Sequence, residues 1–141
     1  MKRSILIAIP LSATLFAPSA PISAQTATTP FTVVETGKSF ARLQLAVNSL
    51  AGRDGTIRIA SGRYRDCAIQ TAGRITYTAA VAGQAIFDTT VCEGKATLVL
   101  RGIGARVQGL VFTRLFVPDG NGAGIRIEKG DLAVYNSMFI D

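Results

Sequence analysis

The feature that most constrains the fold of this chain is a three-residue pattern that recurs at a nearly constant spacing. The three copies are V-A-G at 81–83, V-Q-G at 107–109 and V-Y-N at 134–136. An apolar residue and a phenylalanine follow each copy, as Ile86-Phe87, Val111-Phe112 and Met138-Phe139. A period in the twenties that contains several short strands predicts a solenoid.

The third residue of each copy explains why the pattern recurs. A sharp bend between two strands needs a left-handed backbone, which Gly adopts freely and Asn tolerates better than most residues. An alternating strand precedes each copy, and we expect its apolar residues to stack in one continuous core. The pairs expected to point inward are Ile75/Tyr77, Leu98/Leu100 and Ile125/Ile127, and the residues between them, expected to point outward, are Thr76, Val99 and Arg126.

A helix is predicted before these strands. Phe40, Leu43, Val47 and Leu50 fall on one face of a helix over about 39–51. With this helix, the stretches D-G-T-I-R-I-A-S-G-R-Y-R-D, L-V-L-R-G-I-G-A-R-V-Q-G-L-V-F and G-N-G-A-G-I-R-I-E-K-G-D-L-A-V-Y-N-S-M-F resemble the start of a right-handed parallel β-helix of the pectin-lyase-like type.

The resemblance implies an all-β solenoid with the helix at about 39–51 as its N-terminal cap, about three coils, and a missing C-terminal cap. Residues 37–141 would then be the N-terminal part of a parallel β-helix domain, preceded by a polar lead-in at 25–36. As an alternative to further coils after residue 141, three coils could cover their open end by forming an end-to-end oligomer. An antiparallel sandwich is another, although it does not predict the Gly/Gly/Asn spacing.

The N-terminus has the pattern of a secretory signal peptide. Met1-Lys2-Arg3 is basic, Ser4–Ala17 is apolar, and small residues follow. We predict cleavage after Ala24, export to the periplasm or the medium, and no membrane span after the signal is removed. Without residues 1–24 the formal net charge falls from +6 to +4.

Charge and composition narrow the classes of function. The remaining Lys and Arg are scattered singly, whereas nucleic-acid-binding proteins cluster them. We therefore expect no nucleic-acid partner and a mild preference for anionic material such as an acidic polysaccharide. The chain has no His, which excludes Ser-His-Asp chemistry within it.

The two cysteines, Cys67 and Cys92, are separated by close to one period of the pattern. Neighbouring strands lie about 4.8 Å apart, within the Cα separations that disulfides accept. We predict a Cys67–Cys92 disulfide, with two buried thiols as the alternative. A metal site is not expected, because two Cys without His supply few ligands.

Pectin-lyase-like proteins that act on polysaccharides carry their site outside a parallel sheet. The resemblance implies an Arg or Lys base, and Ca²⁺ only if the complete protein is a lyase; no cofactor is evident in the sequence. Candidate substrate-binding residues are Arg126, Tyr135 and Asp119. Arg101 and Glu128 are one period apart and fit either the site or a surface ion pair.

The expected function is binding of an acidic polysaccharide, with cleavage or epimerisation by the complete protein. One alternative is an envelope or surface protein without enzymatic activity, and another is a truncated product without function. Catalytic residues are not identified, and residues 25–141 alone are expected to be inactive.

Overall fold

The computed structural model describes residues 28–140, which form thirteen strands and one helix. The predicted signal peptide and its cleavage after Ala24 lie outside the described residues. Within residues 25–36, expected to be a polar lead-in, the structure places strand β1 (Phe31–Val33). No helix of the described part is both long and apolar enough to cross a membrane.

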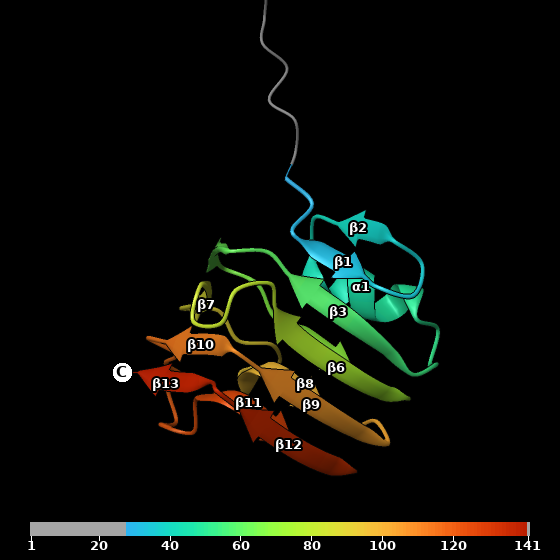
Figure 1. Cartoon of the computed structure of the whole chain (residues 1–141). Helices are drawn as coiled ribbons and strands as arrows, with labels where there is room; N and C mark the ends of the chain where they lie inside the picture. Colours follow the sequence, from blue (N-terminus) through green and yellow to red (C-terminus); the bar gives the residue numbers. More distant parts are fainter. Residues whose placement is uncertain (1–27, 141) are drawn as a thin grey trace, which may run out of the picture.

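A six-stranded sheet faces the viewer in Figure 1. Its strands, in spatial order, are β2 (Lys38–Phe40), β1, β3 (Gly55–Ile59), β6 (Arg74–Ala79), β9 (Gly104–Gln108) and β12 (Asp131–Tyr135). From β3 to β12 the strands are parallel, whereas β1 pairs antiparallel with both β2 and β3.

Two smaller sheets are parallel throughout. The four-stranded sheet contains β4 (Gly62–Tyr64), β7 (Ala85–Asp88), β10 (Leu110–Thr113) and β13 (Met138–Ile140). The three-stranded sheet contains β5 (Ala68–Gln70), β8 (Ala96–Leu100) and β11 (Ala123–Ile127). From β3 onward, each strand of the six-stranded sheet and the strands of the smaller sheets that come next in the chain form one unit, which we call a layer.

The predicted fold class is wrong. We expected a right-handed parallel β-helix, a solenoid with a capping helix at about 39–51, but the largest sheet is mixed and the protein is a three-sheet, mostly β structure with little helix. The physical reason lies at the N-terminal end. Phe31 and Val33 alternate with Thr32 and pair with a second strand across a turn at Gly37 (φ 68°), so residues 38–40 extend a sheet instead of starting the helix.

The recurring bend is confirmed. Gly83, Gly109 and Asn136 have φ angles of 80°, 71° and 46°, and each lies between a strand of the six-stranded sheet and one of the four-stranded sheet. The phenylalanines that follow are also in register, with Phe87 beside Phe112 and Phe112 beside Phe139.

The expected alignment of the preceding strands is only half right. Leu98 and Leu100 pair with Ile125 and Ile127 in the three-stranded sheet, as expected. Ile75 instead belongs to the six-stranded sheet, where it pairs with Gly55 on one side and Ala105 on the other. A longer stretch of chain separates Ile75 from Ala105 than from Gly55. Because the prediction assumed a constant spacing, it aligned Ile75 with a strand of another sheet.

Helix α1 (Leu43–Ser49) covers one end of the core. Leu43, Ala46, Val47 and Leu50 are buried at helical spacing, and the helix contacts β1, β2 and β5. Its N-terminus is capped from a distance: the Leu43 backbone N–H donates to Asp66 Oδ2 at 2.9 Å. This carboxylate replaces the local cap expected of a short helix.

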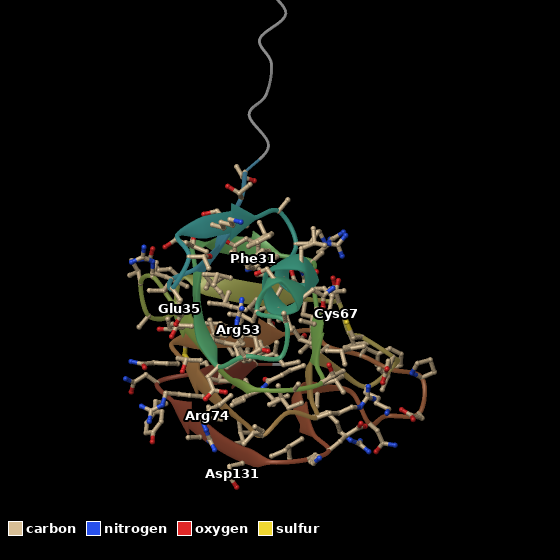
Figure 2. The ribbon with its side chains drawn as sticks, turned by 90° about the vertical axis from the view of Figure 1, so that its right-hand side faces the viewer. Phe31, Glu35, Arg53, Cys67, Arg74 and Asp131 are labelled. Atoms are coloured by element: carbon tan, nitrogen blue, oxygen red, sulfur yellow. A yellow bond between two sulfur atoms is a disulfide. The ribbon has the colours of Figure 1, made fainter. Side chains whose placement is uncertain are left out.

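The core is built around a column of aromatic rings. Phe31, Phe87, Phe112 and Phe139 follow one another along the stack, with ring centroids 6.5, 5.8 and 5.1 Å apart. Tyr77, predicted to be inward, is fully buried and donates from its hydroxyl to Gln70 Oε1. Figure 2 shows the chain progressing from Phe31 near the top to Asp131 at the bottom.

The Cys67–Cys92 disulfide is confirmed, with Cα atoms 5.6 Å apart. It joins the segment before β5 to the segment before β8, and thus two successive layers. A disulfide of this kind is typical of proteins from an oxidising, extracellular environment.

Replacing both cysteines (C67S/C92S) should lower the free energy of unfolding by about 3 kcal/mol, because an open loop of this length regains conformational freedom on unfolding. Urea unfolding of the oxidised protein and of the variant measures the difference. Dithiothreitol should destabilise the wild type and leave the variant unchanged. Equal stability of the two proteins would contradict the prediction.

The aromatic column predicts a graded response to truncation. Phe87→Ala should lower the free energy of unfolding by about 3–5 kcal/mol because it opens a cavity in the core. Phe139→Ala serves as the matched control and should cost less, since Phe139 is 56% exposed whereas Phe87 is fully buried. Chemical denaturation compares the two, and similar losses would show that the column does not stabilise the fold as described.

Candidate functional site

The outer face of the six-stranded sheet carries a continuous row of polar side chains. Strand pairing places one residue from every strand in this row: Ser39, Thr32, Arg58, Thr78, Gln108 and Tyr135. These residues alternate with buried neighbours such as Ile57 and Ile59, so their side chains point away from the core. Strands lie about 4.8 Å apart, and the row therefore spaces hydrogen-bonding groups regularly along the direction in which the layers stack.

Two more cations project from the same face. Arg106 is in register with Thr76, and Arg74 with Gly104, which in turn pairs with Asp131. The three arginines of the face, Arg58, Arg74 and Arg106, are all exposed. Among the ion pairs of residues 28–140, only Arg74 of these three takes part, through a long contact of 3.9 Å to Asp131.

Tyr135 occupies the edge strand of this face. The guanidinium carbon of Arg106 lies 5.0 Å from the centroid of the Tyr135 ring, a cation–π arrangement. The residue is 47% exposed, so part of the ring stays open to a ligand. The sequence predicts Tyr135 as a substrate-binding residue, and its position on a cationic face is compatible with that role.

A small cavity opens between two of the arginines, and we call it the arginine cavity. It has a volume of about 170 Å³ and is lined by Arg74, Thr76, Ala105, Arg106, Asp131, Leu132 and Ala133. Gly104 lies beside Arg74 in the sheet. A methyl group at Gly104 would collide with the Arg74 guanidinium, so the glycine makes the space in which this guanidinium lies along the sheet.

Arg126 and Asp119 do not lie with Tyr135. Arg126 belongs to β11 in the three-stranded sheet, where it pairs with Val99, and Asp119 lies in the preceding turn. Asp119 Oδ1 accepts the Asn121 backbone N–H at 3.0 Å, and this bond lowers the pKa of Asp119, with a smaller contribution from Arg126. The structure therefore separates Tyr135, on the six-stranded sheet, from Arg126, on the three-stranded sheet, and Asp119, in the turn before β11.

Arg101 and Glu128 form the ion pair that their spacing allows. Glu128 Oε2 accepts Arg101 Nε at 2.5 Å and Glu128 Oε1 accepts Lys95 Nζ at 2.6 Å. Arg101 also donates to Glu93. Lys95 first, and then Arg101, lower the pKa of Glu128 to about 2, and each charge of this cluster already has an opposite partner. We therefore assign this cluster a structural role, in which it links successive layers.

Asp88 is a second internally neutralised carboxylate. Arg63 Nη1 lies 2.8 Å from Asp88 Oδ2, and Arg114 donates from Nε to Oδ1 at 2.8 Å. Both guanidinium groups are more than half exposed, and by covering the carboxylate they leave its side chain only 1% exposed. The hydrogen bond from Arg114, followed by that from Arg63, lowers the pKa of Asp88 to about 2.

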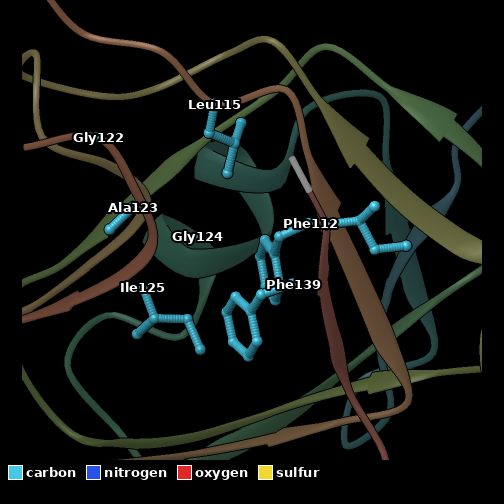
Figure 3. A pocket seen from close by; sticks show the side chains of 8 residues that line it. Phe112, Leu115, Gly122, Ala123, Gly124, Ile125 and Phe139 are labelled. Atoms are coloured by element: carbon cyan, nitrogen blue, oxygen red, sulfur yellow. The ribbon is translucent and has the colours of Figure 1, made fainter. Parts of the chain in front are cut away.

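An apolar pocket of about 240 Å³ lies at the other end of the molecule from α1. Figure 3 shows the Phe112 and Phe139 rings beside Leu115 and Ile125, with Gly122, Ala123 and Gly124 completing the wall. The lining has no ionisable side chain, so it offers no acid, base or anion-binding group. Within residues 28–140, no three His, Cys, Asp or Glu side chains gather where they could hold a metal ion.

Sequence reasoning missed Arg58, Arg74 and Arg106. Their signal is the alternation itself: Arg74 and Thr76 flank Ile75, and Arg106 lies between Ala105 and Val107. The alignment of Ile75 with Leu98 hid this signal, because it matched strands that belong to different sheets.

Comparisons with family models, with curated proteins and with solved structures find no match to this chain. The resemblance to pectin-lyase-like proteins stays a prediction.

The neutralised carboxylates of Asp88 and Glu128 predict that the folded protein loses stability in acid. Their folded-state pKa of about 2 lies below the usual 3.8 of Asp88 and 4.5 of Glu128. A depressed pKa contributes stability that is present above the unfolded-state pKa and is lost as the pH falls through the folded-state pKa. The free energy of unfolding should therefore fall between pH 4.5 and pH 2.

The double variant D88N/E128Q should be less stable at pH 7 and should show a flatter pH dependence over that interval, because neither side chain can then bind a proton. Urea unfolding at a series of pH values measures both effects. An unchanged slope in the double variant would show that other carboxylates cause the acid transition.

Proposed function

We propose that this protein is exported and that the outer face of its six-stranded sheet binds an acidic polysaccharide. The observation that carries the proposal is the projection of Arg58, Arg74 and Arg106 from one sheet face that also presents the Tyr135 ring. Export rests on the predicted signal peptide at 1–24, and the Cys67–Cys92 disulfide supports it.

The composition of the face suits a polymer of acidic sugars. Guanidinium groups bind carboxylates through paired, charge-assisted hydrogen bonds. The hydroxyls of Ser39, Thr32 and Thr78 and the amide of Gln108 can donate to and accept from sugar hydroxyls. An aromatic ring such as that of Tyr135 offers an apolar face with a polar edge, which fits the alternating apolar and polar surfaces of a sugar ring.

The arrangement favours an extended ligand. The polar row crosses all six strands, and about 4.8 Å separates one contributing residue from the next. A linear polymer lying along the stacking direction would meet a hydrogen-bonding or cationic group at each strand. Residues 25–141 alone are expected to be inactive, so this purified protein should release no product from polygalacturonate or alginate.

Replacing the three arginines together (R58Q/R74Q/R106Q) should weaken binding of polygalacturonate about tenfold, because three exposed charge-assisted contacts are lost. Isothermal titration at low ionic strength measures the affinity. Fully methyl-esterified polygalacturonate, which lacks the negative charge, should bind weakly to both proteins.

The matched control is R53Q/R65Q/K129Q, which removes the same number of positive charges from exposed positions outside this face. Its affinity should stay close to that of the wild type. An equal loss in both triple variants would show that only net charge matters, and failure of the wild type to bind any acidic polysaccharide would overturn the proposed function.

A further inference from the structure

The arginine cavity has the properties of a subsite for a single carboxylate. Its lining brings Arg74 and Arg106 together with Thr76, residues whose side chains carry guanidinium and hydroxyl groups. Its volume of about 170 Å³ far exceeds the roughly 30 Å³ that one water molecule occupies in the liquid. The two arginines line it from neighbouring strands of one sheet.

The backbone beside the cavity is held in place from inside. Gln70, fully buried, donates from Nε2 to the Gly104 carbonyl oxygen at 2.9 Å and to the Gly73 carbonyl oxygen at 2.9 Å. The start of β6 is fixed as well, because the Arg74 backbone N–H donates to Asp54 Oδ1 at 2.7 Å. The base of the Arg74 side chain and the backbone under its guanidinium are therefore both anchored.

Gly104 sets the direction of the Arg74 side chain. Its φ is not among the positive values that favour glycine, so the backbone there accepts other residues. The three atoms nearest to a Cβ at this position all belong to the guanidinium end of Arg74, which is flexible. Glycine at 104 therefore serves to keep the space for Arg74 and not to permit an unusual backbone.

Asp131 leaves Arg74 available. Its Oδ2 is 3.9 Å from Arg74 Nη2, and the two side chains are 85% and 51% exposed, so the attraction between them is weak in water. A ligand carboxylate could make shorter, paired hydrogen bonds to the same guanidinium. The Asp131 charge nevertheless partly offsets the two guanidinium charges around the cavity, which disfavours ligand groups of higher negative charge.

We propose that this cavity binds one uronate carboxylate of the polymer, held by Arg74 and Arg106, while Asp131 discriminates against chains that carry phosphate monoesters, whose charge exceeds that of a carboxylate. The inference rests on the proposed function, since it names the sugar group that the same face recognises. Tyr135, whose ring Arg106 contacts, would lie beside the bound sugar.

Gly104→Ala tests the subsite without changing any charge. We expect this variant to bind polygalacturonate about five- to tenfold more weakly, because the new methyl group displaces the Arg74 guanidinium and its paired hydrogen bonds are lost. Arg74→Gln should cause a similar loss. The double variant G104A/R74Q should be no weaker than R74Q alone, because Gly104 acts only through Arg74.

Asp131→Asn tests discrimination. Removing this charge should raise the affinity for a dextran that carries phosphate monoesters about threefold and should change that for polygalacturonate less, since like-charge repulsion grows with the charge of each ligand group. Equal changes for the two polymers would reject a role of Asp131 in discrimination. Arg65→Gln is the control for general charge effects and should bind as the wild type does. Circular dichroism and thermal unfolding of each variant verify that the fold is retained.

The outcomes separate the two proposals. If the wild type binds no acidic polysaccharide, the proposed function fails. If the wild type binds but both G104A and R74Q keep its affinity, the face binds and the subsite assignment is wrong. If G104A weakens binding equally with and without Arg74, the glycine acts through the fold and the subsite is again rejected. If G104A does not fold, the affinities of R74Q and D131N still test the subsite.

Discussion

In-register parallel pairing between successive layers is the constraint on which the rest of this structure depends. Each strand from β3 onward lies beside its counterpart in another layer, so inward residues rest on inward residues. The stacked rings of Phe87, Phe112 and Phe139 are one consequence of this register. The Cys67–Cys92 bond is another, since only a fixed offset between layers brings the two Cα atoms to 5.6 Å. A one-residue slip in any strand would exchange its inward and outward faces.

The same register builds the outer surface. Because side chains alternate along each strand, residues facing solvent form rows across the six-stranded sheet as regular as those in the core. One row contains Arg58, Thr78, Gln108 and Tyr135, and in another the missing side chain of Gly104 makes room for Arg74. The candidate site is thus a product of the core packing, because the pairing that fixes the inward residues also fixes the outward ones.

Charged groups fall into two classes with different roles. Asp88 and Glu128 are each held by two cations, and their low pKa values express that stabilisation. These clusters link layers and have little charge left to offer a ligand. On the six-stranded sheet the arginines are exposed, and among the described residues their only ion pair is the long Arg74–Asp131 contact. The binding face differs from the stabilising clusters in whether its cations have close carboxylate partners, more than in how many cations it has.

The sequence by itself determined the period, the bends and the disulfide, whereas only the tertiary structure decided which sheet each strand enters. Gly83, Gly109 and Asn136 could be recognised because few residues tolerate a left-handed backbone, and Cys67 and Cys92 could be paired because about one period separates them. The partners of β6 could not be read in this way, since the segments that separate it from β3 and from β9, which contain β4–β5 and β7–β8, differ in length and periodicity does not account for them. For a related reason the antiparallel β1–β2 pair was missed: it depends on the free edge of β3, which exists only after the sheet has formed. The residues around the arginine cavity become neighbours through this pairing alone, because hydrogen bonds between strands, and not distance along the chain, place them side by side.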